Sequence, residues 1–176
     1  MKMLNLVVGD LKANCYILYE DHKCLIIDPG AEEDSIMKKV KRIKCEPIGI
    51  LLTHNHFDHT GAADILSSHY KIPVFDYKNL EEGTKKLGPF EFTVIETKGH
   101  SNTSLTYYFE DYDIMICGDF VFKENIGRVD LPGGSFPDMI KSINRLKKYD
   151  DHIVLYPGHG DKTTIGHEKK HNKYFI

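Results

Sequence analysis

The feature that most constrains this chain is an apolar segment that ends directly in a cluster of polar side chains. Residues 48–53 are predicted to form a buried strand, and His54, His56, Asp58 and His59 follow it at once. Three imidazoles and a carboxylate are costly to hold together unless a cation lies among them, and these ligand types suit zinc, iron and manganese. In an extended segment His54 and His56 point to the same side, while a turn can aim Asp58 and His59 at a second point. One short loop can therefore serve two metal ions.

Three further candidate ligands occur later in the chain, each beside a glycine. His100 and Asp119 each follow a glycine, and His159 lies between two glycines. Glycine lets the backbone turn sharply or approach closely. Together these residues give five histidines and two aspartates, about what a dinuclear site with one bridging carboxylate needs. The other five histidines have no paired ligand at short spacing and are interpreted as ordinary: His22, His69, His152, His167 and His171.

Length and composition indicate a globular chain without an obvious macromolecular partner. The 176 residues are expected to form one domain, residues 1–176, with 41% hydrophobic and 28% charged residues. A net charge of −3 disfavours nucleic-acid binding, and no apolar run approaches the roughly 20 residues of a membrane span. The N-terminal apolar stretch is too short for a signal peptide, so a cytoplasmic location is expected. Cys15, Cys24 and Cys117 lie in apolar runs and are expected to be buried free thiols.

The hydrophobic pattern alternates strands with helices, and each candidate ligand group follows a predicted strand. Strands are predicted at 4–8, 15–19, 24–28, 48–53, 73–75, 90–96, 105–109, 114–117 and 153–156, and helices at 32–44, 60–69, 136–146 and 164–173. Ser135 is the expected N-cap of the third helix. From the pattern alone the fold class is α/β or α+β.

These residues resemble a known family. The pattern His54-x-His56-x-Asp58-His59, followed by His100, Asp119 and His159, resembles the metallo-β-lactamase superfamily. Residues 14–18, 118–134 and 156–168 are similar to its glyoxalase II-like branch, the hydroxyacylglutathione hydrolases, in the short bacterial form without a C-terminal helical domain. The resemblance implies a four-layer αβ/βα sandwich with the metal site at one edge of its two sheets. It is far less specific for substrate, because this superfamily supports many reactions.

The resemblance also implies roles for the candidate ligands. His54, His56 and His100 would bind one divalent ion, Asp58, His59 and His159 a second, and Asp119 would bridge both. Zinc is expected, with iron or manganese as alternatives. A hydroxide between the ions would attack a carbonyl, oriented by Asp58 as the catalytic residue. The implied activity is that of a thioesterase that cleaves S-D-lactoylglutathione or a related small-molecule thioester.

Substrate recognition is less completely implied. Arg128 stands where the family has a basic residue that contacts a carboxylate of glutathione; the alternative is an arginine that only braces the loop of Gly133 and Gly134. Asp130 and Asp161 stand where the longer enzymes have tyrosines. Those enzymes also continue into a basic C-terminal domain, whereas this sequence ends soon after the last ligand. Weak or altered glutathione recognition is therefore expected.

Three other functions are kept as alternatives. A persulfide dioxygenase-like oxidoreductase would use the same positions to hold a single iron. A lactonase or β-lactamase would use the same site on another ester or amide, although a secreted β-lactamase is disfavoured by the missing signal peptide. A metal-binding protein without activity is disfavoured because no ligand position is lost.

Overall fold

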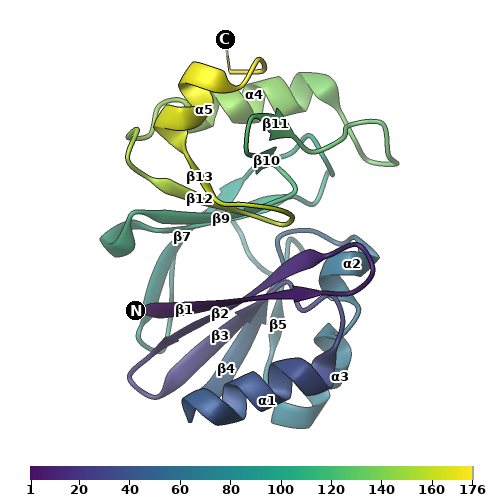
Figure 1. The fold of residues 1–176 in the computed structure, drawn as a ribbon, viewed down its shortest axis with the longest axis vertical. Coiled ribbons are helices and arrows are strands. Elements are labelled where there is room, and N and C mark those ends of the chain that lie inside the picture. The colour runs from purple at the N-terminus through teal and green to yellow at the C-terminus, as the bar shows by residue number, and fades with distance from the viewer. Residues whose placement is uncertain (176) are drawn as a thin grey trace.

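Two β-sheets lie face to face with helices on both outer sides in the computed structural model, which describes residues 1–175 (Figure 1). The first sheet has the order β1-β2-β3-β4-β5, with antiparallel pairing from β1 to β3 and parallel pairing from β3 to β5. Its strands are β1 Lys2–Val8, β2 Ala13–Glu20, β3 Lys23–Ile27, β4 Glu46–Leu51 and β5 Val74–Phe75.

The second sheet has the order β13-β12-β9-β8-β7-β6. Its strands are β6 Gly83–Leu87, β7 Phe90–Glu96, β8 Leu105–Phe109, β9 Ile114–Gly118, β12 Val154–Pro157 and β13 Thr163–Thr164. The short strands β10 Val121–Phe122 and β11 Asn125–Ile126 pair with each other as a separate hairpin.

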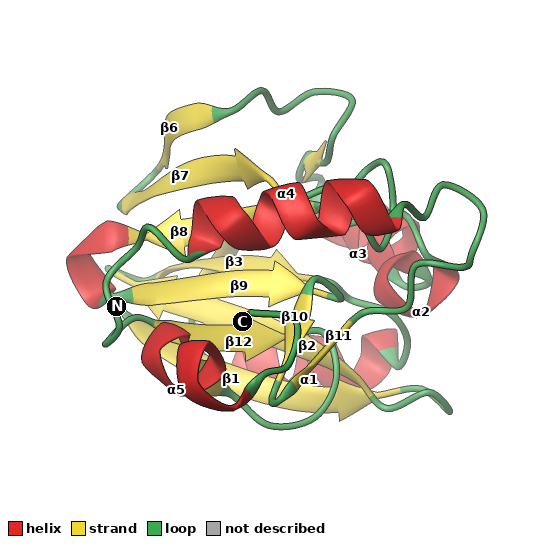
Figure 2. Cartoon of the chain, turned by 90° about the horizontal axis from the view of Figure 1, so that it is seen from above, coloured by secondary structure: helices red, strands yellow, loops and turns green. Residues whose placement is uncertain are grey.

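Helices α1 Glu33–Ile43 and α3 Ala63–Tyr70 cover the outer face of the first sheet, and α4 Phe136–Leu146 and α5 Ile165–His171 that of the second. Figure 2 looks down on the second sheet and shows α4 and α5 lying over its strands. The remaining helical segments are α2 Phe57–Thr60 and the 3-10 turn η1 Glu110–Tyr112. Within residues 1–175, no helix has the length and apolar character needed to cross a membrane.

Side-chain alternation along the strands produces three layers of core. In β3, Cys24 and Ile26 pack towards α1, while Leu25 and Ile27 face the second sheet. Because the central strands β2, β3 and β4 are buried on both faces over most of their length, their sequences carry runs of apolar residues, as residues 48–53 do. The four-layer sandwich is therefore confirmed.

Two tyrosines reach across the layer between the sheets. Tyr16 on β2 donates its hydroxyl to the carbonyl oxygen of Pro157 at 2.6 Å, and Tyr107 on β8 donates to that of Leu52 at 2.5 Å. Both rings are fully buried. Each acceptor carbonyl lies two residues before a candidate metal ligand, so the contacts fix the strand ends that carry the site.

Most predicted elements agree with the structure, and the differences have local causes. Ser135 is the N-cap of α4 and accepts a hydrogen bond from the amide of Asp138, as expected. Strand β6 was not predicted, because Gly-Thr-Lys-Lys-Leu is a half-exposed edge strand with lysines on it. Helix α2 begins at Phe57, inside the ligand cluster, where only a turn was predicted.

Candidate metal centre

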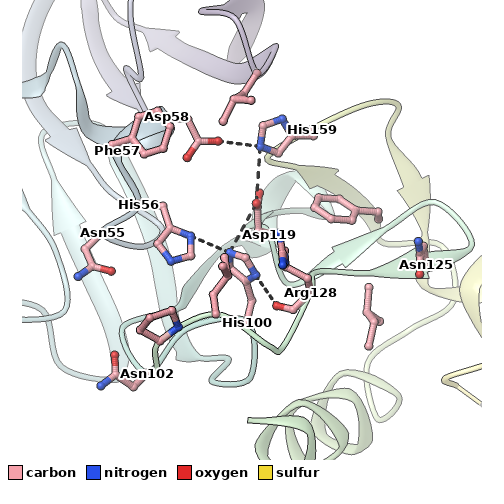
Figure 3. A pocket seen from close by; sticks show the side chains of 15 residues that line it. Asn55, His56, Phe57, Asp58, His100, Asn102, Asp119, Asn125, Arg128 and His159 are labelled. Carbon is pink, nitrogen blue, oxygen red and sulfur yellow. Dashed lines mark hydrogen bonds and ion pairs between the residues drawn. The ribbon is translucent and has the colours of Figure 1, made fainter. Parts of the chain in front are cut away.

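The candidate ligands lie on four connecting segments at one edge of the sandwich. The segment after β4 carries the first four of them, with Asp58 and His59 in the short helix α2, and the loops after β7, β9 and β12 each carry one of the others. Strands of both sheets therefore contribute, and the rigid strand ends hold residues that are far apart in sequence. In Figure 3, His56, His100, Asp58, Asp119 and His159 surround a common centre at the base of a cavity.

One group consists of His54, His56 and His100, whose ligand atoms lie within 4.8 Å of one another. The Nδ1 of His56 and the Nε2 of His100 are 2.9 Å apart. Ligands of a tetrahedral ion at about 2.0–2.1 Å are spaced by roughly 3.3 Å, so this spacing fits a shared cation.

The second group consists of Asp58, His59 and His159. The Nε2 atoms of His59 and His159 are 3.3 Å apart. Oδ2 of Asp58 lies 3.1 Å from Nε2 of His159. These distances again suit donor atoms around one ion.

Asp119 lies between the two groups. Its Oδ1 is 3.3 Å from Nε2 of His59, and its Oδ2 is 3.6 Å from the Nε2 atoms of both His100 and His159. One carboxylate thus faces both groups, as a bridging ligand must. Gly158 permits this approach, because a Cβ at that position would overlap Oδ1 of Asp119.

Asp28, at the end of β3, orients the first loop. Its Oδ2 accepts hydrogen bonds from Oγ1 of Thr53 at 2.6 Å and from Nδ1 of His59 at 3.0 Å. Since the Thr53 hydroxyl donates to Asp28, its oxygen accepts from Nδ1 of His54, 3.0 Å away. Both imidazoles are therefore held with Nε2 turned to the site.

His100 is oriented in the same way by a backbone carbonyl. Its Nδ1 donates to the carbonyl oxygen of Arg128 at 2.8 Å. The lone pair of its Nε2 is then available to the first group.

Two buried atoms at this centre have no hydrogen-bond partner among residues 1–175: Nε2 of His54 and Oδ1 of Asp119. The contact of Oδ1 with His59 is close, but it lacks hydrogen-bond geometry. Leaving such atoms unpaired is costly, and each is a free lone pair that points into the cluster. The residues present therefore fit a pair of divalent metal ions.

The charges of the site follow the same arrangement. Burial, together with the nearby His59, lowers the pKa of His54, so this imidazole is neutral. Burial opposes a charge on His59 as well, but its contacts with Asp119 and Asp28 raise its pKa to about 10. Burial also works against ionised Asp119, yet His59 holds the pKa of this carboxyl well below its usual value. In the metal-free site, the protonated ring of His59 therefore supplies a positive charge beside the carboxylates of Asp28 and Asp119.

A cavity of about 880 Å³ opens above the centre. Five candidate ligands line its base, and its walls are largely apolar: Leu11, Phe57, Phe122, Ile126, Leu131 and Pro132. Leu11 and Phe57 are 55% and 75% exposed, which is unusual for such side chains and places apolar surface at the entrance. The cavity is large enough for a small organic substrate.

All seven predicted ligands are brought together, and their binding of metal stays a prediction. Asp28, His54 and His59 form a third cluster of possible ligand atoms, and the five other histidines lie outside all three clusters found among residues 1–175. His152 and His167, for example, contact Asp113 and Glu124. Arg128 lines the cavity, with its guanidinium on Asp130. Sequence reasoning missed the role of Asp28, although an aspartate before Pro-Gly at a strand end was a usable signal.

Comparison with known sequences gives a consistent result. The family model described as the metallo-beta-lactamase superfamily matches residues 8–82 and 75–159. The chain is 34% identical to the probable metallo-hydrolase YqgX of Bacillus subtilis, over 99% of this chain and 97% of that protein. It is 28% identical to the hydroxyacylglutathione hydrolase GloC of Haemophilus influenzae, over 95% and 94% of the two chains.

Solved structures show the same fold. The B3 metallo-beta-lactamase BLEG-1 superposes with a TM-score of 0.96 at 31% identity, over 99% of this chain and 100% of that one. TTHA1623 in a di-iron-bound form superposes with a TM-score of 0.90 at 29% identity, over 97% and 99% of the two chains.

Proposed function

Because the chain belongs to the metallo-beta-lactamase superfamily, we propose that it is a metal-dependent hydrolase that cleaves small-molecule thioesters, in the manner of glyoxalase II. The observation that carries the proposal is the pair of unpartnered buried lone pairs, on His54 and Asp119, inside two converging ligand groups. The 28% identity to a hydroxyacylglutathione hydrolase supports thioesters in particular.

The expected metal ligands are the seven histidines and aspartates that the sequence predicts. His54, His56 and His100 would hold one ion, Asp58, His59 and His159 the second, and Asp119 would contact both. When bound, two divalent ions would supply a water that is acidic enough to ionise near neutral pH and positive charge for a developing oxyanion.

The side chains then position and shield the reaction. Asp58 lines the cavity and keeps part of its carboxylate exposed, so it can accept a hydrogen bond from the attacking water and orient it. Asp28 keeps the imidazole of His59 fixed. A substrate that covers the apolar walls would displace water from the site, which would strengthen electrostatic interactions within it.

A thioester suits this arrangement because a thiolate leaves without strong acid assistance. The side chains at the centre are imidazoles and carboxylates that the ligand set already uses. A substrate that needs no further proton donor therefore fits best.

The test is hydrolysis of two lactoyl thioesters by zinc-loaded protein with metal content confirmed. The substrates are S-D-lactoylglutathione and the uncharged S-D-lactoyl-N-acetylcysteamine, followed by thiol release. We expect saturable turnover that falls by at least about a hundredfold in Asp119→Ala, with His152→Ala as the matched control. Undiminished turnover in Asp119→Ala, or none of either thioester by the loaded wild type, would overturn the proposal.

An iron-dependent oxidoreductase is the second candidate, because a structure 29% identical to this chain was solved in a di-iron-bound form. Iron content after expression, with oxygen uptake in the presence of glutathione persulfide, distinguishes it. Oxygen uptake without thioester hydrolysis would favour this candidate.

A further inference from the structure

The cavity has one cationic wall residue, and that residue is already paired. Among the lining residues Arg128 is the single lysine or arginine. Its Nε and one terminal nitrogen donate to the two carboxylate oxygens of Asp130, each at 2.8 Å. This bidentate fork is the geometry with which an arginine would bind a ligand carboxylate.

The pairing is intramolecular, and the two residues are two positions apart. A carboxylate tethered at this distance acts at an effective concentration of about millimolar or higher, so a free ligand must compete with it for the guanidinium. The pair is also open to solvent, with side chains 62% and 66% exposed, so a ligand can displace Asp130, but at a cost in affinity. An uncharged ligand meets no unpaired positive charge at Arg128, because Asp130 already neutralises the guanidinium.

The rest of the wall gives an anionic ligand little compensation. The other lining side chains are apolar, amide or candidate metal ligands, including two carboxylates. Beyond the reacting group, an uncharged substrate therefore meets a matching surface.

We propose that Asp130 is a specificity-determining residue that occupies the guanidinium of Arg128 and biases the cavity towards thioesters whose non-reacting part is uncharged. This inference rests on the proposed function for its substrate class. The pairing itself can be tested without turnover.

The probes are N-acetyl-S-hexylglutathione, which carries two carboxylates and no ammonium group, and its neutral diamide. Binding of each to zinc-loaded protein is measured by titration calorimetry. We expect wild type to bind the diamide at least as tightly as the dianion. Asp130→Asn should tighten the dianion by about two- to fivefold relative to the diamide, the range expected when an exposed ion pair competes.

Two further variants make the result specific. Asp138→Asn removes the same charge from another exposed pair, with Lys141, away from the cavity, and should leave the ratio of the two affinities unchanged. Arg128→Ala combined with Asp130→Asn should lose the gain, while the backbone carbonyl that holds His100 is kept.

The outcomes separate the two proposals. A relative gain for the dianion in Asp130→Asn supports the inference even if no thioester is hydrolysed. Wild-type preference for the dianion, an equal change for both probes, or the same gain in Asp138→Asn would overturn it. In the hydrolysis assay, the corresponding expectation is a higher kcat/KM for the acetylcysteamine thioester than for the glutathione thioester.

Discussion

Asp28 is the residue whose influence on the site extends furthest beyond its own contacts. Its carboxylate accepts hydrogen bonds from Thr53 and His59. Through the Thr53 hydroxyl it also sets the orientation of the His54 ring. It therefore orients one imidazole of each ligand group without belonging to the predicted ligand set. Such outer carboxylates set the tautomer and the basicity of the histidines they contact.

Replacing Asp28 should weaken metal binding more than it weakens the fold. In Asp28→Asn the amide oxygen can still accept from the backbone N–H of Thr53, but the amide nitrogen presents N–H where the His59 ring and the Thr53 hydroxyl need an acceptor. We expect zinc affinity to fall by roughly 10- to 100-fold, measured by competition with a chromogenic chelator. Asp64→Asn, on the exposed side of α3, is the matched control. Equal affinities of the two variants would contradict the role given to Asp28.

The protonation states of the metal-free site give a prediction that depends on pH. With its pKa raised to about 10 by Asp119 and Asp28 against the cost of burial, His59 should carry two protons at pH 8 and lose one near pH 10. His54, with its pKa lowered by burial and His59, should be neutral with its proton on Nδ1. Nitrogen-15 NMR of the imidazoles of metal-free protein measures both. A neutral His59 at pH 8 would show that the contacts with Asp28 and Asp119 are weaker than inferred.

At the scale of elements, the ligand loops depend on the tyrosines between the sheets. The Tyr107 hydroxyl donates to the carbonyl of Leu52, where the strand passes into the ligand loop. Tyr107→Phe leaves this buried carbonyl without that partner, which should cost about 1–3 kcal/mol in the free energy of unfolding. Urea denaturation measures it.

The control is Tyr108→Phe, which alters the neighbouring ring in the outer layer of the second sheet. We expect Tyr107→Phe also to reduce zinc affinity, while Tyr108→Phe keeps it. A loss of stability in both variants without any change in affinity would limit Tyr107 to a packing role.

Elements were predictable where the pattern was continuous and less so where it was short. Residues 90–96 and 105–109 form strands with the predicted bounds, because their buried faces leave a clear signal. The hairpin of β10 and β11 has two residues in each strand, too few for periodicity to show.

The candidate ligands were predictable because their chemistry is local to each motif. The pairing of Arg128 with Asp130 was not, because spacing alone does not say whether two exposed side chains meet. The apolar wall was also not predictable from the sequence, since it combines the loop before β2, the start of α2, the hairpin of β10 and β11 and the segment that follows it.

For the whole molecule, the three core layers predict how the thiols behave. Burial raises the pKa of Cys24 and of Cys117 to about 12, and these thiols lie in opposite outer layers of the core. Cys15 is equally buried, whereas Cys45 is partly exposed. Native zinc-loaded protein should therefore show one fast-reacting thiol out of four with Ellman's reagent, and Cys45→Ser should abolish that phase.

Removing the metal should speed the slow reaction of the buried thiols with Ellman's reagent. The candidate ligands come from both sheets at one edge of the sandwich, so a bound metal should stabilise the native state and oppose its opening. Treatment with a chelator is expected to lower Tm and to accelerate labelling of Cys117, two residues from Asp119. Identical labelling rates with and without metal would argue that the edge is held by protein contacts alone.

The two tyrosines cross the middle layer in opposite directions, one from each sheet. Each acts as a spacer of one side-chain length between a strand of one sheet and the ligand-bearing segment of the other. The separation of the two halves of the site is thereby tied to the length of a rigid tyrosine side chain and one hydrogen bond. Because neither tyrosine lines the cavity, substitutions in its walls or entrance should leave the spacing of the candidate ligand groups unchanged.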